Sequence, residues 1–92
     1  MTLSLDEYRN KLINKILFAC SQEEVRRFCH AAMKGLEQHK VNGHIATRFA
    51  DKIIKELEQF DPVNKNAQQW SNIKMAKIEI NRIKQQIIAT AN

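Results

Sequence analysis

The stretch from Gln38 to Arg48, QHKVNGHIATR, concentrates residues that can bind a metal ion or a phosphate. His39 and His44 lie on either side of Gly43, and both could ligate zinc through an imidazole nitrogen. A zinc site needs about four converging ligands, and this stretch lacks a CxxC pair, a third histidine and the i, i+4 spacing of two histidines on one helix face. We therefore predict a turn without a metal, in which Gly43 adopts a positive φ.

Cysteine and glutamate side chains are the other candidates for chemistry. Cys29 lies in an apolar helical stripe, where a cysteine usually packs as a small hydrophobic residue. His30 projects about 100° away from it, so the two cannot act as nucleophile and base within one helix. Cys20 has no basic neighbour in the sequence, and the sequence has no phosphate-binding glycine loop or GxSxG motif. We predict no catalytic residue, no enzymatic activity, no cofactor and no small-molecule substrate.

Composition limits the class of protein. The chain has 92 residues, of which 43% are hydrophobic and 27% are charged, as expected for one helical domain spanning residues 1–92. No apolar run approaches the ~20 residues of a membrane span, and acidic residues near the start do not fit an export signal. Two cysteines without CxxC spacing suit a reducing compartment. We expect a soluble, cytoplasmic protein.

Helical periodicity extends over almost the whole chain, because only two glycines and one proline interrupt it. Ser-x-x-Glu capping boxes begin two helices, at Ser4 and at Ser21. "DPVN" at 61–64 ends a third helix, and Asn66 with Gln69 offers a cap for the last one. The predicted helices cover residues 5–18, 22–38, 44–60 and about 66–88. We therefore predict an all-α fold, a small four-helix bundle with a long C-terminal helix.

The last predicted helix carries more apolar surface than one neighbour can cover. Met75 and Ile78 lie on nearly the opposite side from its main apolar row, and Trp70 and Ile88 lie at intermediate angles. The other helices of the chain could cover both flanks. Alternatively, the helix could pair with its own copy, since most small oligomers are two-fold and exposed apolar patches are unfavourable. We expect a homodimer. The main row has coiled-coil spacing and consists of Ile73, Ala76, Ile80, Ile83 and Ile87.

Positive charge is concentrated in the last third of the chain. Residues 62–92 carry five cations and one acid, whereas residues 1–61 carry ten cations and nine acids. Lys74, Lys77 and Lys84 border the apolar row, with Trp70 and Asn81 between them. A basic helix with an aromatic side chain could follow a nucleic-acid backbone. Alternatively, the lysine stems could pack over the apolar row while their ammonium groups remain in water.

These features favour a cytoplasmic helical module that binds another protein, or a second copy of itself, through the last helix. Four apolar side chains of this helix are the ones that fit least well on a single core-facing side. Interfaces favour aromatic residues and methionine. The predicted protein-binding residues are therefore Trp70, Met75, Ile78 and Ile88.

Two alternative functions remain open. One is nucleic-acid binding by the basic last helix, through Lys74, Lys77 and Lys84. The other follows from a resemblance in size, basicity and helix count, in which the chain looks like the small helical immunity proteins that protect bacteria from their own bacteriocins. That resemblance implies a protective role against a membrane-active toxin.

Overall fold

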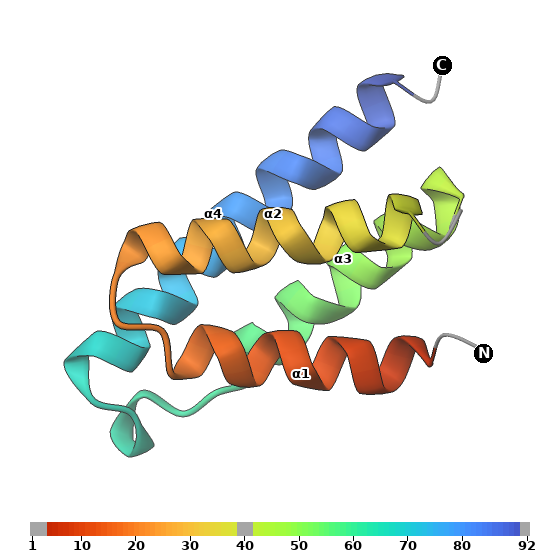
Figure 1. Cartoon of the computed structure of the whole chain (residues 1–92). Coiled ribbons are helices and arrows are strands. Elements are labelled where there is room, and N and C mark those ends of the chain that lie inside the picture. The colour runs from red at the N-terminus through yellow and green to blue at the C-terminus, as the bar shows by residue number, and fades with distance from the viewer. Residues whose placement is uncertain (1–3, 39–41, 91–92) are drawn as a thin grey trace.

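Four α-helices form an all-α bundle in the structure, a computed structural model that describes residues 4–38 and 42–90. The described residues contain no strand. The predicted four-helix bundle with a long C-terminal helix is confirmed, and this last helix is continuous. The elements are α1 (Leu5–Leu17), α2 (Gln22–Gln38), α3 (Gly43–Glu58), the 3₁₀ turn η1 (Pro62–Asn64) and α4 (Ala67–Thr90) (Figure 1).

The longest helix, α4, organises the bundle. It packs against each of the other three helices, most extensively against α3 and α2, while α1 also contacts α2 and α3. Its 24 residues span about 36 Å at the usual rise of an α-helix. In Figure 1 the C-terminal end of α4 lies at the top of the view, and Ile87 near this end still packs against the core. α4 therefore contributes to the core from Asn72 to Ile87.

The first two helices begin at the predicted serine caps. The backbone N–H of Glu7 donates to Ser4 Oγ at 3.4 Å, and that of Glu24 donates to Ser21 Oγ at 3.2 Å. The carboxylate of Glu24 also accepts a hydrogen bond from the backbone N–H of Cys20 at 2.7 Å. These side chains satisfy N–H groups that have no partner within the helix, which fixes where each helix starts.

Two successive caps precede α4. Asp61 accepts a hydrogen bond from the backbone N–H of Val63 at 3.0 Å and so begins the short turn η1. Asn66 and Gln69 then form a reciprocal cap: the Gln69 N–H donates to Asn66 Oδ1 at 2.8 Å, and the Asn66 N–H donates to Gln69 Oε1 at 3.3 Å. The second cap sets the start of α4 at Ala67.

The predicted positive φ at Gly43 is wrong. Gly43 is the first residue of α3, and its φ lies outside the positive region. Asn42 caps the helix instead, with φ −71° and ψ 162°, and its side chain accepts a hydrogen bond from the Ile45 N–H at 2.9 Å. The side-chain cap starts α3 one residue earlier than predicted, and the helix ends at Glu58 rather than at residue 60.

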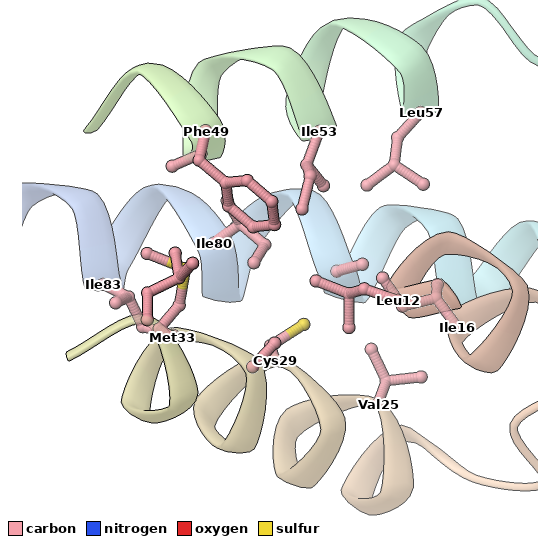
Figure 2. Close-up of a cluster of buried hydrophobic side chains, with 14 of the residues drawn as sticks. Leu12, Ile16, Val25, Cys29, Met33, Phe49, Ile53, Leu57, Ile80 and Ile83 are labelled. Carbon is pink, nitrogen blue, oxygen red and sulfur yellow. The ribbon is translucent and has the colours of Figure 1, made fainter. Parts of the chain in front are cut away.

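The apolar row of α4 lies inside the bundle rather than on its surface. Ile73, Ala76 and Ile80 have no accessible surface, Ile83 has 7%, and Ile87 packs against the core. Figure 2 shows Ile80 beside Phe49 of α3 and Ile83 beside Met33 of α2. The coiled-coil spacing of this row therefore serves packing within one chain. Its labelled neighbours in Figure 2 are Leu12 and Ile16 of α1, Val25, Cys29 and Met33 of α2, and Phe49, Ile53 and Leu57 of α3.

A close approach at Gly35 joins α1 to α2. The hydroxyl of Tyr8 donates to the carbonyl of Ala32 at 2.7 Å, and burial raises the pKa of this phenol, which keeps it protonated as a donor. The Tyr8 ring also packs against that of Phe49, with centroids 5.7 Å apart. A Cβ atom at Gly35 would collide with the Tyr8 hydroxyl oxygen. The glycine therefore provides the space in which this hydrogen bond forms.

A double-mutant cycle tests this contact. In the wild type, Gly35→Ala displaces the Tyr8 hydroxyl and breaks its hydrogen bond. This loss lowers the free energy of unfolding by about 1 kcal/mol and offsets a similar gain from helix propensity. In the Tyr8→Phe background the hydroxyl is gone, so Gly35→Ala should raise the free energy of unfolding by about 0.5–1 kcal/mol. Urea unfolding of the four proteins measures both effects. Equal effects in the two backgrounds would contradict the contact.

Candidate protein-interaction surface

The four residues predicted to contact a partner lie in two environments. Trp70 and Met75 are half-buried and pack against the core of their own chain. Ile78 and Ile88 remain exposed, with 55% and 42% of their surface accessible. The bundle therefore covers half of the predicted set and leaves two isoleucines of α4 exposed.

A shallow depression of about 400 Å³ lies beside Ile78. Ile54 and Glu58 of α3 and Lys77, Ile78 and Asn81 of α4 line it. Because α3 and α4 form the most extensive helix pair of the bundle, both walls of the depression belong to well-packed helices. An apolar side chain placed there would contact one isoleucine from each helix.

The three lysines predicted to bind nucleic acid differ in their surroundings. Lys84 donates to Asp51 of α3, and only 21% of its side chain is exposed. The ammonium of Lys74 lies 5.9 Å from the ring centroid of Trp70, within the range of a cation–π contact. Lys77 lines the depression between α3 and α4. Because Asp51 already balances the charge of Lys84, the predicted nucleic-acid surface loses one of its three cations.

Glu79 connects α4 to α2 from a buried position. Its Oε1 lies 3.4 Å from Arg26 Nε and 3.3 Å from Arg82 Nη1, and its Oε2 lies 3.2 Å from His30 Nε2. Only 2% of the Glu79 side chain is exposed, against 57% to 60% for its three partners. Water therefore solvates the partners but not the carboxylate, so these contacts must offset the cost of burying it.

Sequence reasoning misses Glu79, although a signal was present. Glu79 follows the buried Ala76 by three residues, and Arg82 follows Glu79 by three, the spacing of an ion pair on one helix face. A carboxylate at the edge of an apolar row could therefore have been expected near a cation. The contribution of Arg26 and His30 depends on the packing of α2 against α4, which the local pattern does not contain.

Cys29 lies in the core, close enough to Glu79 for the negative charge of Glu79 to affect its thiol. Burial, and to a smaller extent the negative charge of Glu79, raise the pKa of the Cys29 thiol to about 12. The thiolate is the nucleophilic form of cysteine, and this environment disfavours it. The neighbouring His30 bonds to Glu79 and is mostly exposed. The arrangement fits a packing role for Cys29.

A second hollow of about 500 Å³ lies between α2, α3 and α4. Met33, Ala46 and Ile83, all largely buried, contribute its apolar lining. Lys34 and Glu37 of α2 bring charges of opposite sign to the same hollow. Because both signs are present, these charges provide no preference for an anionic or a cationic ligand.

The predicted histidine turn is only partly described. His44 is exposed in the first turn of α3, and His39 lies outside the described residues. Across residues 4–38 and 42–90, no group of three or more His, Cys, Asp or Glu side chains is placed to hold a metal ion. Among these residues there is also no helix with the length and apolar character needed to cross a bilayer.

Comparisons with protein-family models, curated proteins and solved structures gave no significant match to this chain. The two exposed isoleucines of α4, with the depression beside Ile78, form a surface that a partner could use.

The contacts of Glu79 predict a non-additive effect on stability. Arg26→Met or Arg82→Met alone should lower the free energy of unfolding by less than about 1 kcal/mol, because the remaining arginine and His30 still face the carboxylate. The double variant should lose about 2–3 kcal/mol, more than the sum, because both guanidinium partners of a buried carboxylate are gone. Urea unfolding measures the three values. In the Glu79→Gln background the two substitutions should be additive, and additivity with Glu79 present would refute this role.

The two thiols should differ in reactivity toward iodoacetamide. Cys20 is exposed, whereas Cys29 is buried with a pKa of about 12, so its thiolate fraction at pH 8 is about 10⁻⁴. We expect Cys29 of the folded protein to be alkylated at least about 100-fold more slowly than Cys20. Mass spectrometry of digested samples gives both rates. In urea the rates should converge, and similar rates in the native protein would show that Cys29 is accessible.

Proposed function

We propose that this chain is a small helical module that binds another protein through the exposed face of α4. One observation carries the proposal: Ile78 and Ile88 remain exposed although α1, α2 and α3 already cover the apolar row of α4. A bound partner would remove both isoleucines from water, each worth about 1–2 kcal/mol when half its surface is covered. The depression beside Ile78 supports the same location, because a side chain of the partner could fill it.

A second copy of the chain is one candidate for this partner, so the homodimer stays a prediction. Two-fold pairing is the commonest arrangement of small oligomers. A cytoplasmic location also belongs to the proposal, and it is supported by two unpaired cysteines, one of them exposed. In a reducing compartment the exposed Cys20 would not form an intermolecular disulfide.

The two alternatives have weaker support. Nucleic-acid binding by Lys74, Lys77 and Lys84 stays a prediction, and the ion pair between Lys84 and Asp51 reduces the free positive charge available for it. The bacteriocin-immunity role also stays a prediction, since it depends on resemblance in size, basicity and helix count.

Site-specific photo-crosslinking in the native cell tests the proposal. A photoreactive phenylalanine analogue replaces Ile78 in one strain and Ile88 in another, and it replaces the exposed Lys52 of α3 as the control. We expect a discrete crosslinked product from the two α4 positions and none from the control position. The mass of the product separates the outcomes, because a second copy doubles the mass of the chain, 10.7 kDa.

Folding has to be equal in the three variants for this comparison. All three positions are exposed, so circular dichroism and urea unfolding should show no difference among them. If the α4 positions gave no product, or gave the same products as Lys52, the binding function of α4 would be refuted.

A further inference from the structure

The exposed charges of α4 are all positive. Lys74 and Lys77 lie on or beside its exposed face, while Glu79, the only acid of α4, is buried against α2. Arg82 is paired with Glu79, and Lys84 is paired with Asp51. The face that carries Ile78 therefore presents two lysines without an acidic neighbour on the same helix.

This charge distribution opposes pairing of α4 with its own copy. In a dimer that pairs the two α4 helices, Lys74 and Lys77 of each copy would face an α4 whose only carboxylate, Glu79, is buried and bonded to Arg26 and Arg82. Glu58 of α3, which lines the depression with Lys77, is a single carboxylate against these two lysines. Like charges brought together at an interface cost affinity and select against that partner. A partner with carboxylates at the matching positions would gain from the same lysines.

The outer row of α4 suits a helical partner. It consists of Lys74, Ile78, Asn81, Gln85 and Ile88, with the alternating spacings of four and three that a second helix follows. Ile78 and Ile88 would contact apolar positions of that helix. The depression of about 400 Å³ between Ile54 and Ile78 would receive one larger side chain as an anchor.

We infer that the outer row of α4 binds an acidic amphipathic helix of a partner protein. An apolar side chain of that helix lies between Ile54 and Ile78, and its carboxylates pair with Lys74 and Lys77. Glu58 lines the α3 side of the depression, so the acidic residues belong on the edge of the partner helix that faces α4. This inference rests on the proposed function and adds the chemistry and location of the partner.

Two designed peptides of about 20 residues test the charge of the partner. They share one leucine pattern and carry either glutamates or lysines at the flanking positions. Fluorescence anisotropy with the full chain at ~50 mM salt should show at least tenfold tighter binding of the glutamate peptide, and this preference should shrink at ~500 mM salt as screening increases. Equal or tighter binding of the lysine peptide would overturn the acidic character of the partner, while the proposed function would stand.

Matched variants test the location. Ile78→Asp should weaken binding of the glutamate peptide at least tenfold, whereas Phe18→Asp, at a residue that is 74% exposed in the α1–α2 connection, should leave it unchanged. Lys77→Glu should weaken binding more than Lys52→Glu, which changes the net charge of the protein equally. Equal effects within either pair would place the peptide elsewhere and overturn the inferred location.

Two further results separate failure of the inference from failure of the proposed function. If neither peptide bound but crosslinking from position 78 gave a product, the acidic-helix inference would be wrong and the binding function would stand. If neither peptide bound and no crosslinked product formed, the acidic-helix inference and the proposed function would both be refuted. If a mixed-sequence DNA duplex bound in competition with the glutamate peptide and more tightly, the choice of a protein partner would be overturned in favour of nucleic acid.

Discussion

Because α4 packs against all three other helices, the burial of its apolar row is the constraint on which the rest of the structure depends. α2 and α3 make their most extensive contacts with α4. Each fully buried isoleucine of the row contributes about 2–3 kcal/mol of hydrophobic stabilisation. The same burial limits the proposed binding surface to the side chains of α4 that lie outside the row.

Two buried polar side chains at the edge of this row select one packing of α4. Asn72 donates to the carbonyl of Ala19 at 2.9 Å and accepts a hydrogen bond from Gln68, and Glu79, seven residues later, meets the cations of α2. No buried side-chain nitrogen or oxygen among the described residues lacks a partner. A shift of α4 by one turn would leave the amide and the carboxylate buried without these partners, at a cost of several kcal/mol. Apolar contacts alone would distinguish such registers less sharply.

Local patterns in the sequence predict the helices and the buried row, but not what surrounds α4. The capping pairs at Ser4, Ser21 and Asn66 act within four residues, so the sequence contains all that determines them. Gly43 shows the limit of residue-type reasoning: glycine permits a positive φ, but the Asn42 side chain offered a cap that made it unnecessary.

Which of the predicted contact residues become buried depends on tertiary packing and not on the local sequence pattern. All four predicted contact residues lie outside the apolar row of α4. Trp70 and Met75 nevertheless pack against the core, whereas Ile78 and Ile88 remain exposed. The angle of a residue on its helix cannot reveal this difference, because it depends on where the other helices lie and end.

The lengths of the helices explain why some of α4 has to remain uncovered. With 24 residues it spans about 36 Å, whereas α1, α2 and α3 have 13, 17 and 16 residues and span about 20 to 26 Å. No single neighbour reaches both ends of α4, and three neighbours on one side cannot also cover the outer row. Ile87, near the end of α4, still packs against the core, so the outer row with Ile78 and Ile88 is the part of α4 that adds surface rather than core. This excess, together with the absence of an exposed acid on α4, is the physical basis for expecting a partner that supplies both apolar surface and carboxylates.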